Sequence, residues 1–193
     1  MAQMKTPGVY IIEKNAFPNS VVEVATAIPA FIGHTQFARD GNKDLTGIPF
    51  RISSMAEFHS FFGFAPTLRF GIRPEDSESE DTTNDINVLF PDGSCQLTLP
   101  KTFYALYYNM LLFYANGGGP CYIVSVGDYE HDFKSIDFTN ALLALKKEQE
   151  PTLVVVPEAV YMEEGDCYKV QTAALMHCGN DTLDSVSYTH LTL

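Results

Sequence analysis

Two apolar stretches in the second half of the chain set the pattern of the fold. Residues 103–114 are apolar on all sides of a helical wheel, which is typical of a buried helix. Residues 121–126 form a short run rich in β-branched side chains, which predicts a strand buried on both faces. Between the two lies a predicted structural turn, made of Asn116, Gly117, Gly118, Gly119 and Pro120. Asn and Gly end a helix in the left-handed conformation, and proline prevents the helix from resuming.

The glycines of this turn also invite comparison with a phosphate-binding loop. Such a loop follows a strand and opens a helix, so that the helix N–H groups point at the anion. Here the helix comes first and the strand second, and no Lys-Ser or Lys-Thr pair follows. The sequence therefore favours the structural turn.

The chain downstream of residue 127 continues the alternation of strand and helix. Asp137 is a candidate cap for a helix from 138 to about 147, followed by a continuous apolar strand at 153–156 and a helix at about 167–178. Strand, helix, strand and helix of these lengths predict a βαβα unit in an α/β fold. We expect a right-handed crossover, with the strands at 122–126 and 153–156 parallel.

The chain upstream of residue 103 predicts a small region of strands with one helix. Short β-prone runs predict strands at 21–24, 30–33 and 48–52, and a polar stretch at 37–45 predicts a loop. Ser54 and Glu57 have the spacing of a capping box, which predicts a helix over 55–62 that ends at Gly63. We expect its aromatic face to pack in the core: Phe58, Phe61, Phe62 and Phe64.

An acidic segment at residues 73–87 interrupts this region. It is rich in Asp and Glu but has no glycine, so it lacks the central turn residue of an EF-hand calcium loop. A solvated loop is the better interpretation. Two β-prone runs follow at 86–90 and 95–99, and the Asp-Gly between them predicts a hairpin.

An isolated β-prone run lies near the N-terminus. A turn signal precedes it, and the breakers Asn15 and Pro18 follow it, so it has no obvious local partner. The run pairs either with an edge of its own domain or with another subunit by strand addition, and the residues alone leave both open. The candidate residues of this arm are Thr6, Pro7, Gly8, Val9, Tyr10, Ile11 and Ile12.

Composition and charge narrow the possible functions. The chain has 193 residues, 46% of them hydrophobic, which suits one domain with a real core. Its net charge of −12 argues against nucleic acid and against anionic membrane surfaces. The four cysteines have no metal-binding spacing, and we expect free thiols. No HExxH, GxSxG or GxGxxG motif is present, so we expect no enzyme activity, no cofactor and no metal.

Three runs resemble a known family. They are TPGVYI at 6–11, TAIPAFIG at 26–33 and LLFYANGGGPCYIVSVG at 111–127. Together they resemble the tail sheath proteins, which are the subunits of contractile phage tails and of bacterial contractile injection systems. The resemblance extends from about residue 5 to about residue 180, with a gap at the acidic segment. Its most specific pieces, 6–10 and 116–126, contain no catalytic motif, so it concerns assembly.

The resemblance implies a structural subunit. Sheath subunits stack as rings around an inner tube protein and contract to drive the tube through a target envelope; baseplate and tail terminator proteins are further partners. For the N-terminal run, the resemblance favours pairing with another subunit, because sheath arms exchange strands between neighbouring subunits. It also implies the cytoplasm of the producing bacterium as the first location, and then the assembled phage tail or injection particle.

The last residues depart from the family pattern. In sheath proteins the helix that corresponds to 167–178 is followed by a strand of the type DRxAILD, whereas this chain has DTLDSVSYTHLTL. We therefore expect an N-terminal fragment, truncated before the next strand, with a non-native read-through tail at 181–193. The expected organisation is an inter-subunit arm at 1–20 and an α/β sheath domain at 21–180. The alternatives are a small cytosolic α/β protein that binds a nucleotide or metabolite, and a monomeric binding module.

Overall fold

The central element is a five-stranded mixed sheet. The computed structural model describes residues 27–68, 70–74, 85–90, 93–98, 102–181 and 186–188. The strand order is β10 (Val186–Tyr188), β9 (Leu153–Val155), β1 (Pro29–Gly33), β8 (Cys121–Ser125) and β4 (Phe50–Ile52). The first four strands are parallel, and β4 runs antiparallel to β8 at one edge.

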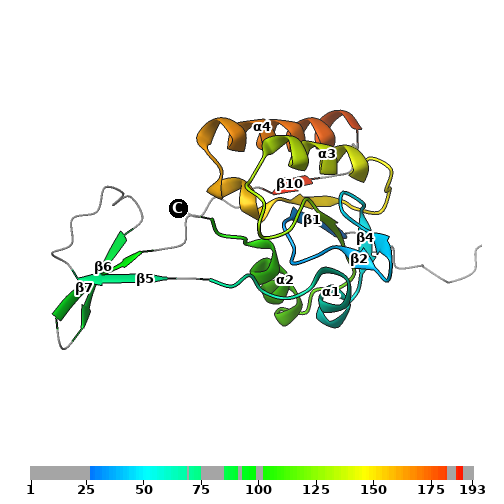
Figure 1. Cartoon of the computed structure of the whole chain (residues 1–193). Helices are drawn as coiled ribbons and strands as arrows, with labels where there is room; N and C mark the ends of the chain where they lie inside the picture. Colours follow the sequence, from blue (N-terminus) through cyan, green and yellow to red (C-terminus); the bar gives the residue numbers. More distant parts are fainter. Residues whose placement is uncertain are drawn as a thin grey trace, which may run out of the picture.

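Helices cover both faces of this sheet (Figure 1). The helices α3 (Ser135–Leu145) and α4 (Glu164–Met176) lie on one face, and α1 (Met55–Phe62) and α2 (Leu106–Ala115) lie on the other. A short 3-10 helix, η1 (Pro157–Tyr161), follows β9, and a π-helical turn, η2 (His177–Asp181), follows α4. The chain thus has three layers and belongs to the α/β class that the sequence predicts.

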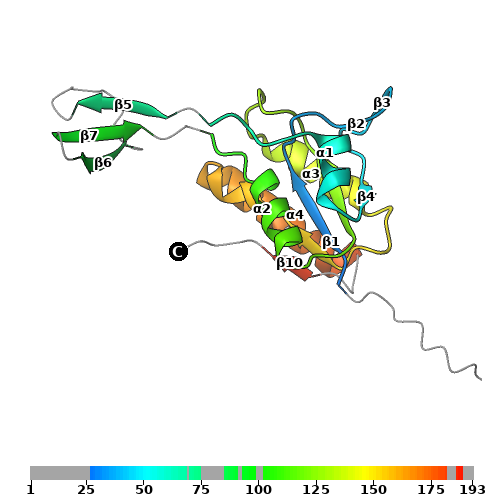
Figure 2. The same ribbon diagram turned by 90° about the horizontal axis from the view of Figure 1, so that it is seen from below.

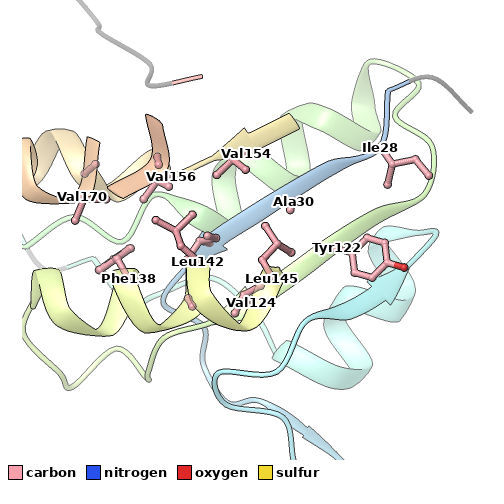
Figure 3. Close-up of a cluster of buried hydrophobic side chains, with 14 residues drawn as sticks. Ile28, Ala30, Tyr122, Val124, Phe138, Leu142, Leu145, Val154, Val156 and Val170 are labelled. Atoms are coloured by element: carbon pink, nitrogen blue, oxygen red, sulfur yellow. The ribbon is translucent and has the colours of Figure 1, made fainter. Parts of the chain in front are cut away.

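Alternation along the parallel strands builds two cores. Ala30 and Ile32 of β1 point to the layer of α3 and α4, whereas Phe31 between them packs with α1 and α2. Strand β8 divides in the same way, with Val124 in the first core and Ile123 in the second. Figure 3 shows the first core, in which Phe138, Leu142 and Leu145 of α3 meet the sheet. Because both faces are covered, these strands are apolar throughout.

Two smaller sheets lie outside the central sheet. The short strands β2 (Arg39–Asp40) and β3 (Lys43–Asp44) form a hairpin. The strands β5 (Gly71–Pro74), β6 (Asp85–Phe90) and β7 (Gly93–Thr98) form a three-stranded antiparallel sheet with β7 in the middle. Figures 1 and 2 show this second sheet standing to one side of the three layers.

The strands at β8 and β9 are parallel, as predicted, but they are not neighbours. Strand β1 lies between them and forms hydrogen bonds with both, with Ala30 paired to Tyr122 on one side and to Val154 on the other. The order of strands along the chain does not reveal that β1 lies between β8 and β9, because β1 precedes the βαβα unit by almost ninety residues of sequence. Strand β10 follows α4 and extends the parallel sheet beyond β9, although the sequence predicts that the chain is truncated before this strand.

Several predicted boundaries are wrong at the starts of helices. Helix α2 begins at Leu106 rather than at residue 103, and α3 begins at Ser135, so that Asp137 lies in its first turn and is not its cap. Helix α4 begins at Glu164, three residues before the predicted start. None of these three helices has a side-chain N-cap bond, so the sequence carries no local signal for where they begin.

Two predicted loops contain strands. Residues 37–45 include the β2–β3 hairpin, and both ends of the segment 73–87 belong to strands β5 and β6. The predicted hairpin at 86–90 and 95–99 is present as β6 and β7. Residues 75–84 and the predicted strand at 21–24 lie outside the described residues. Within the described part of the chain, no helix has the length and apolarity needed to cross a membrane.

Candidate functional site

In a mostly parallel sheet covered by helices on both faces, a ligand site is expected at the carboxyl ends of the strands. In doubly wound sheets, ligands bind where neighbouring strands lead to helices on opposite faces. Strands β1 and β9 are such a pair. From β1 the chain leads through β2, β3 and β4 to α1 on one face, and from β9 it leads through η1 to α4 on the other. His34 comes directly after β1, and Glu158 lies in η1 directly after β9.

His34 and Glu158 meet at this position. The His34 Nδ1 and Glu158 Oε2 atoms are 2.7 Å apart, and their side chains are only 1% and 0% exposed. The backbone N–H of His34 donates to the same Oε2 at 2.9 Å, and the backbone N–H of Leu106 donates to Oε1 at 3.4 Å. The carboxylate therefore joins the ends of two strands to the first residue of α2, which has no side-chain cap of its own.

Aromatic rings close the space around this pair. The rings of Tyr104, Phe133 and Phe138 lie between 5.1 and 5.7 Å from the His34 ring, measured between centroids. Burial raises the pKa of Tyr104, and the nearby Glu158 carboxylate raises it further. The same two causes, in the same order, raise the pKa of Tyr129. The position where a doubly wound sheet usually binds a ligand is filled here by the protein's own side chains.

A pair of hydroxyl groups extends the buried polar cluster to β8. Thr35 Oγ1 and Ser125 Oγ are 2.6 Å apart, and the Thr35 hydroxyl donates to the carbonyl of Phe37. The Ser125 hydroxyl lies 3.3 Å from the carbonyl of Gly127, which also accepts the backbone N–H of Thr35. Each of these groups has a partner within the chain, so the cluster stabilises the loops at this edge.

The exposed groups at the same edge are Asp128 and His131. His131 Nδ1 and Asp128 Oδ1 are 2.5 Å apart, and both side chains are open to solvent. The backbone N–H of Glu130 and the imidazole of His131 hold the pKa of Asp128 below its usual value. Among the described residues, no group of three or more His, Cys, Asp or Glu side chains could hold a metal ion. The described cysteines are free.

The predicted turn at Asn116–Pro120 links α2 to β8. Gly117 has a φ of +83°, whereas Asn116 has a φ of −95°, so glycine alone takes the left-handed position. The backbone N–H of Gly118 donates to the carbonyl of Phe113 at 2.9 Å, which completes the helix end. The predicted arm, Thr6–Ile12, lies outside the described residues.

The carboxylates Glu163, Glu164 and Asp166 cluster at the start of α4. Asp166 Oδ1 accepts from Lys169 Nζ at 2.7 Å and from the Ser135 hydroxyl at 3.0 Å. These two hydrogen bonds lower the pKa of Asp166. The group ties α4 to the start of α3, which is a structural role.

Sequence reasoning missed the pairing of His34 with Glu158. The sequence does show that His34 directly follows the predicted strand at 30–33 and that Glu158 lies two residues after the predicted strand at 153–156, and that was the available signal. It does not show that β1 and β9 are neighbours, so the two side chains could not be brought together. It also predicted a helix buried all round, whereas Leu111 and Leu112 of α2 are 48% and 64% exposed.

No family model matches the chain, and no curated protein matches it.

Proposed function

We propose that this chain is a structural subunit of a contractile tail sheath, which polymerises around an inner tube and contracts to drive the tube through a target envelope. The proposal starts from the resemblance of residues 6–11, 26–33 and 111–127 to sheath proteins. Its partners would be further copies of the subunit, the tube protein, and the baseplate and tail terminator proteins. The assembly would form in the cytoplasm of the producing bacterium and then act in the phage tail or injection particle.

The position of two resembling runs in the fold carries the proposal. The run at 26–33 ends in β1, and the run at 111–127 contains β8, although they are some ninety residues apart in the sequence. The two strands are hydrogen-bonded neighbours, with Phe31 paired to Ile123 and Ile32 to Val124. The resemblance therefore falls on one contiguous part of the core, which supports a shared fold over scattered similarity.

The buried pair at the switch point also supports a mechanical role. His34 and Glu158 fill the place where a nucleotide or metabolite would bind, and their polar atoms serve each other and the start of α2. A sheath needs no hydrolysed nucleotide. It needs two arrangements of similar subunits separated by a difference in free energy, so that the lattice itself is bistable.

Deletion of the N-terminal run tests the proposal. The full-length sheath protein would be purified and examined by electron microscopy and sedimentation velocity, alone and with a tube protein from the same source. We expect rings or tubes that disappear when residues 1–13 are deleted, while the circular dichroism and the thermal transition of the folded domain persist. Deletion of residues 1–4 is the matched control, because it keeps the run at 6–12. Assembly that survives loss of residues 1–13 would refute the arm, and a full-length protein that forms no rings or tubes in any condition would refute the subunit role.

The sheet topology also fits one alternative function, that of a small α/β protein that binds a nucleotide or metabolite. Ligand binding to the native state raises the midpoint of thermal unfolding by an amount set by RT ln(1 + [L]/Kd). A panel of nucleotides at millimolar concentration should therefore leave the midpoint unchanged if the sheath proposal is right. A saturable rise with one compound would favour the alternative.

A further inference from the structure

The outer face of α2 is an apolar surface that the described residues leave open. No charged residue occurs between Leu106 and Ala115, and Leu111 and Leu112 are 48% and 64% exposed. A hollow beside Leu112 is lined by Phe31, Asn109, Phe113 and the turn that follows the helix. A helix that is apolar on all sides is normally buried on all sides. The described part of the chain buries only one side of this helix.

The sheet of β5, β6 and β7 has an apolar side as well. The register pairs Leu97 of the central strand with Ile72 and with Ile86, and it pairs Cys95 with Val88. Ile72, Val88, Cys95 and Leu97 alternate along their strands, so they share one face of the sheet. Ile72 is 67% exposed, and Val88, Cys95 and Leu97 are partly exposed. The alternate register row is polar and contains Arg73, Gln96 and Asn87.

The exposed apolar face of such a small sheet is stabilised when another element packs on it. Three short strands are stable when their hydrophobic face packs against another element. Figures 1 and 2 show β5, β6 and β7 beside the three layers, and no described helix lies on them. The chain therefore has two apolar surfaces of complementary type, one helix face and one sheet face, which is the pairing found in layered α/β structures.

We propose that the apolar face of β5, β6 and β7 of one copy packs on the outer face of α2 of another copy. The charge of the chain supports a second copy as the occupant. At a net charge of −12, two copies repel each other, so they associate where charge is absent. Both the α2 segment and the apolar register rows of the sheet are free of charged residues.

The dimensions of the two surfaces match. The ten residues of α2 span about 15 Å, close to the width of about 14 Å for three strands. The six residues of β7 span about 20 Å, which gives the sheet face a flat area of roughly 280 Å². A stable interface buries about 800 Å² on each partner, so this contact is weak alone and strengthens when it is repeated along a polymer.

The contact joins two different surfaces, so it is a head-to-tail contact and does not form a twofold-symmetric pair. Head-to-tail contacts of this kind generate rings or open helical filaments. This names one lattice contact of the proposed sheath and rests on that proposal only for its biological purpose. Its failure is separable, because deletion of the arm tests the sheath, whereas substitutions in α2 and β5 test this contact.

Two substitutions and their mixture test the contact in the full chain. Leu112→Ser changes the α2 face, and Ile72→Thr changes the sheet face while keeping a β-branched residue. Leu143→Ser is the matched control for the first, since Leu143 is an exposed leucine (51%) on α3. Gln96→Thr, on the alternate row of β7, is the control for the second. Sedimentation equilibrium would measure the weight-average mass up to about 1 mM.

The wild type and both controls should gain mass with concentration, and each test variant alone should have at least tenfold weaker association. An equimolar mixture of the two test variants should recover association but stop at two copies, because only one contact is intact in the mixed pair. A monomeric wild type would overturn the proposal. Loss of association in Ile72→Thr but not in Leu112→Ser would also overturn it and would indicate sheet-to-sheet pairing. Test variants with lower thermal midpoints but the mass of the wild type would indicate packing within one chain and would equally overturn it.

Discussion

His34 and Glu158 are 124 residues apart in the sequence, and their Nδ1 and Oε2 atoms lie 2.7 Å apart in the core. Through this pair and the bond from Leu106, three elements meet: the ends of β1 and β9 and the start of α2. All three belong to different layers or strands of the fold. The pair thus fixes the position of the sheet relative to the helix that follows the β5–β7 insertion.

Replacing Glu158 tests this role. Glu158→Gln keeps the size of the side chain but replaces the carboxyl group that pairs with His34 Nδ1 and accepts from two backbone N–H groups. Hydrogen bonds to buried charged groups contribute about 1.5–3 kcal/mol, so we expect the free energy of unfolding to fall by roughly 2 kcal/mol. Urea denaturation measures it. Glu130→Gln, at an exposed glutamate, should change it by less than about 0.5 kcal/mol. Equal effects of the two substitutions would contradict the role of the pair.

Close packing at Gly33 gives a second prediction. A Cβ at this position would lie 2.9 Å from the Cβ of Leu106 and 3.1 Å from the Cδ of Glu158. Overpacking of this kind costs about 1–3 kcal/mol, so Gly33→Ala should lower the thermal midpoint by several degrees. Gly119→Ala is the control, because a Cβ there meets no atom within 4 Å. A variant Gly33→Ala with the stability of the wild type would mean that α2 can move away from the sheet at little cost.

Tyr122 predicts how stability depends on alkaline pH. Burial, together with its hydrogen bond to Glu150, raises the pKa of Tyr122 to about 12, compared with about 10 in an unfolded chain. The folded state therefore holds this proton more tightly. Its contribution is complete below pH 10 and is lost as the pH rises towards 12. We expect the free energy of unfolding to fall by up to about 2 kcal/mol across this window.

The variant Tyr122→Phe isolates this contribution. It has no phenol to titrate, so its free energy of unfolding should fall less steeply between pH 10 and pH 12 than that of the wild type. Tyr104 and Tyr129 also have raised pKa values, so some slope should persist in the variant. Identical slopes for variant and wild type, measured by urea denaturation at several pH values, would contradict the prediction.

The cap of α1 gives a local prediction. The Ser54 hydroxyl accepts from the backbone N–H of Glu57 at 3.3 Å, as the capping-box spacing predicts. The Glu57 carboxylate, however, accepts from the backbone N–H of Ser53 at 2.6 Å, one residue before the predicted partner. Ser54→Ala should cost about 1 kcal/mol of stability. Ser60→Ala, within the same helix and exposed, should be close to neutral, and a reversed order of the two effects would count against the cap.

Local signals in the sequence placed α1 and the turn after α2 well. Helix α1 spans Met55–Phe62, as predicted, because a serine cap and a glycine stop act within a few residues of the positions they specify. Its aromatic face is only partly in the core. Phe58 and Phe62 are fully buried, Phe61 is partly buried, and Phe64 is exposed because it lies beyond Gly63, where the helical pattern no longer holds.

Helix starts without a local signal were misplaced. Helix α2 begins where the N–H of Leu106 reaches Glu158, a residue 52 positions further along the chain. Such a cap comes from tertiary structure, and no pattern near residue 106 contains it. The same holds for the exposed leucines of α2, since an all-apolar helix indicates burial but does not identify the partner that provides it.

The sequence by itself determined the α/β class, the apolar strands β1, β8 and β9, and the turn at Asn116–Pro120, because periodicity, β-branched runs and glycine act over short distances. Only the tertiary structure decided that β1 lies between β8 and β9 and that His34 meets Glu158. It also decided which apolar faces the described residues leave open. The order of strands in a sheet depends on long-range pairing, and an apolar strand fits equally well beside any other.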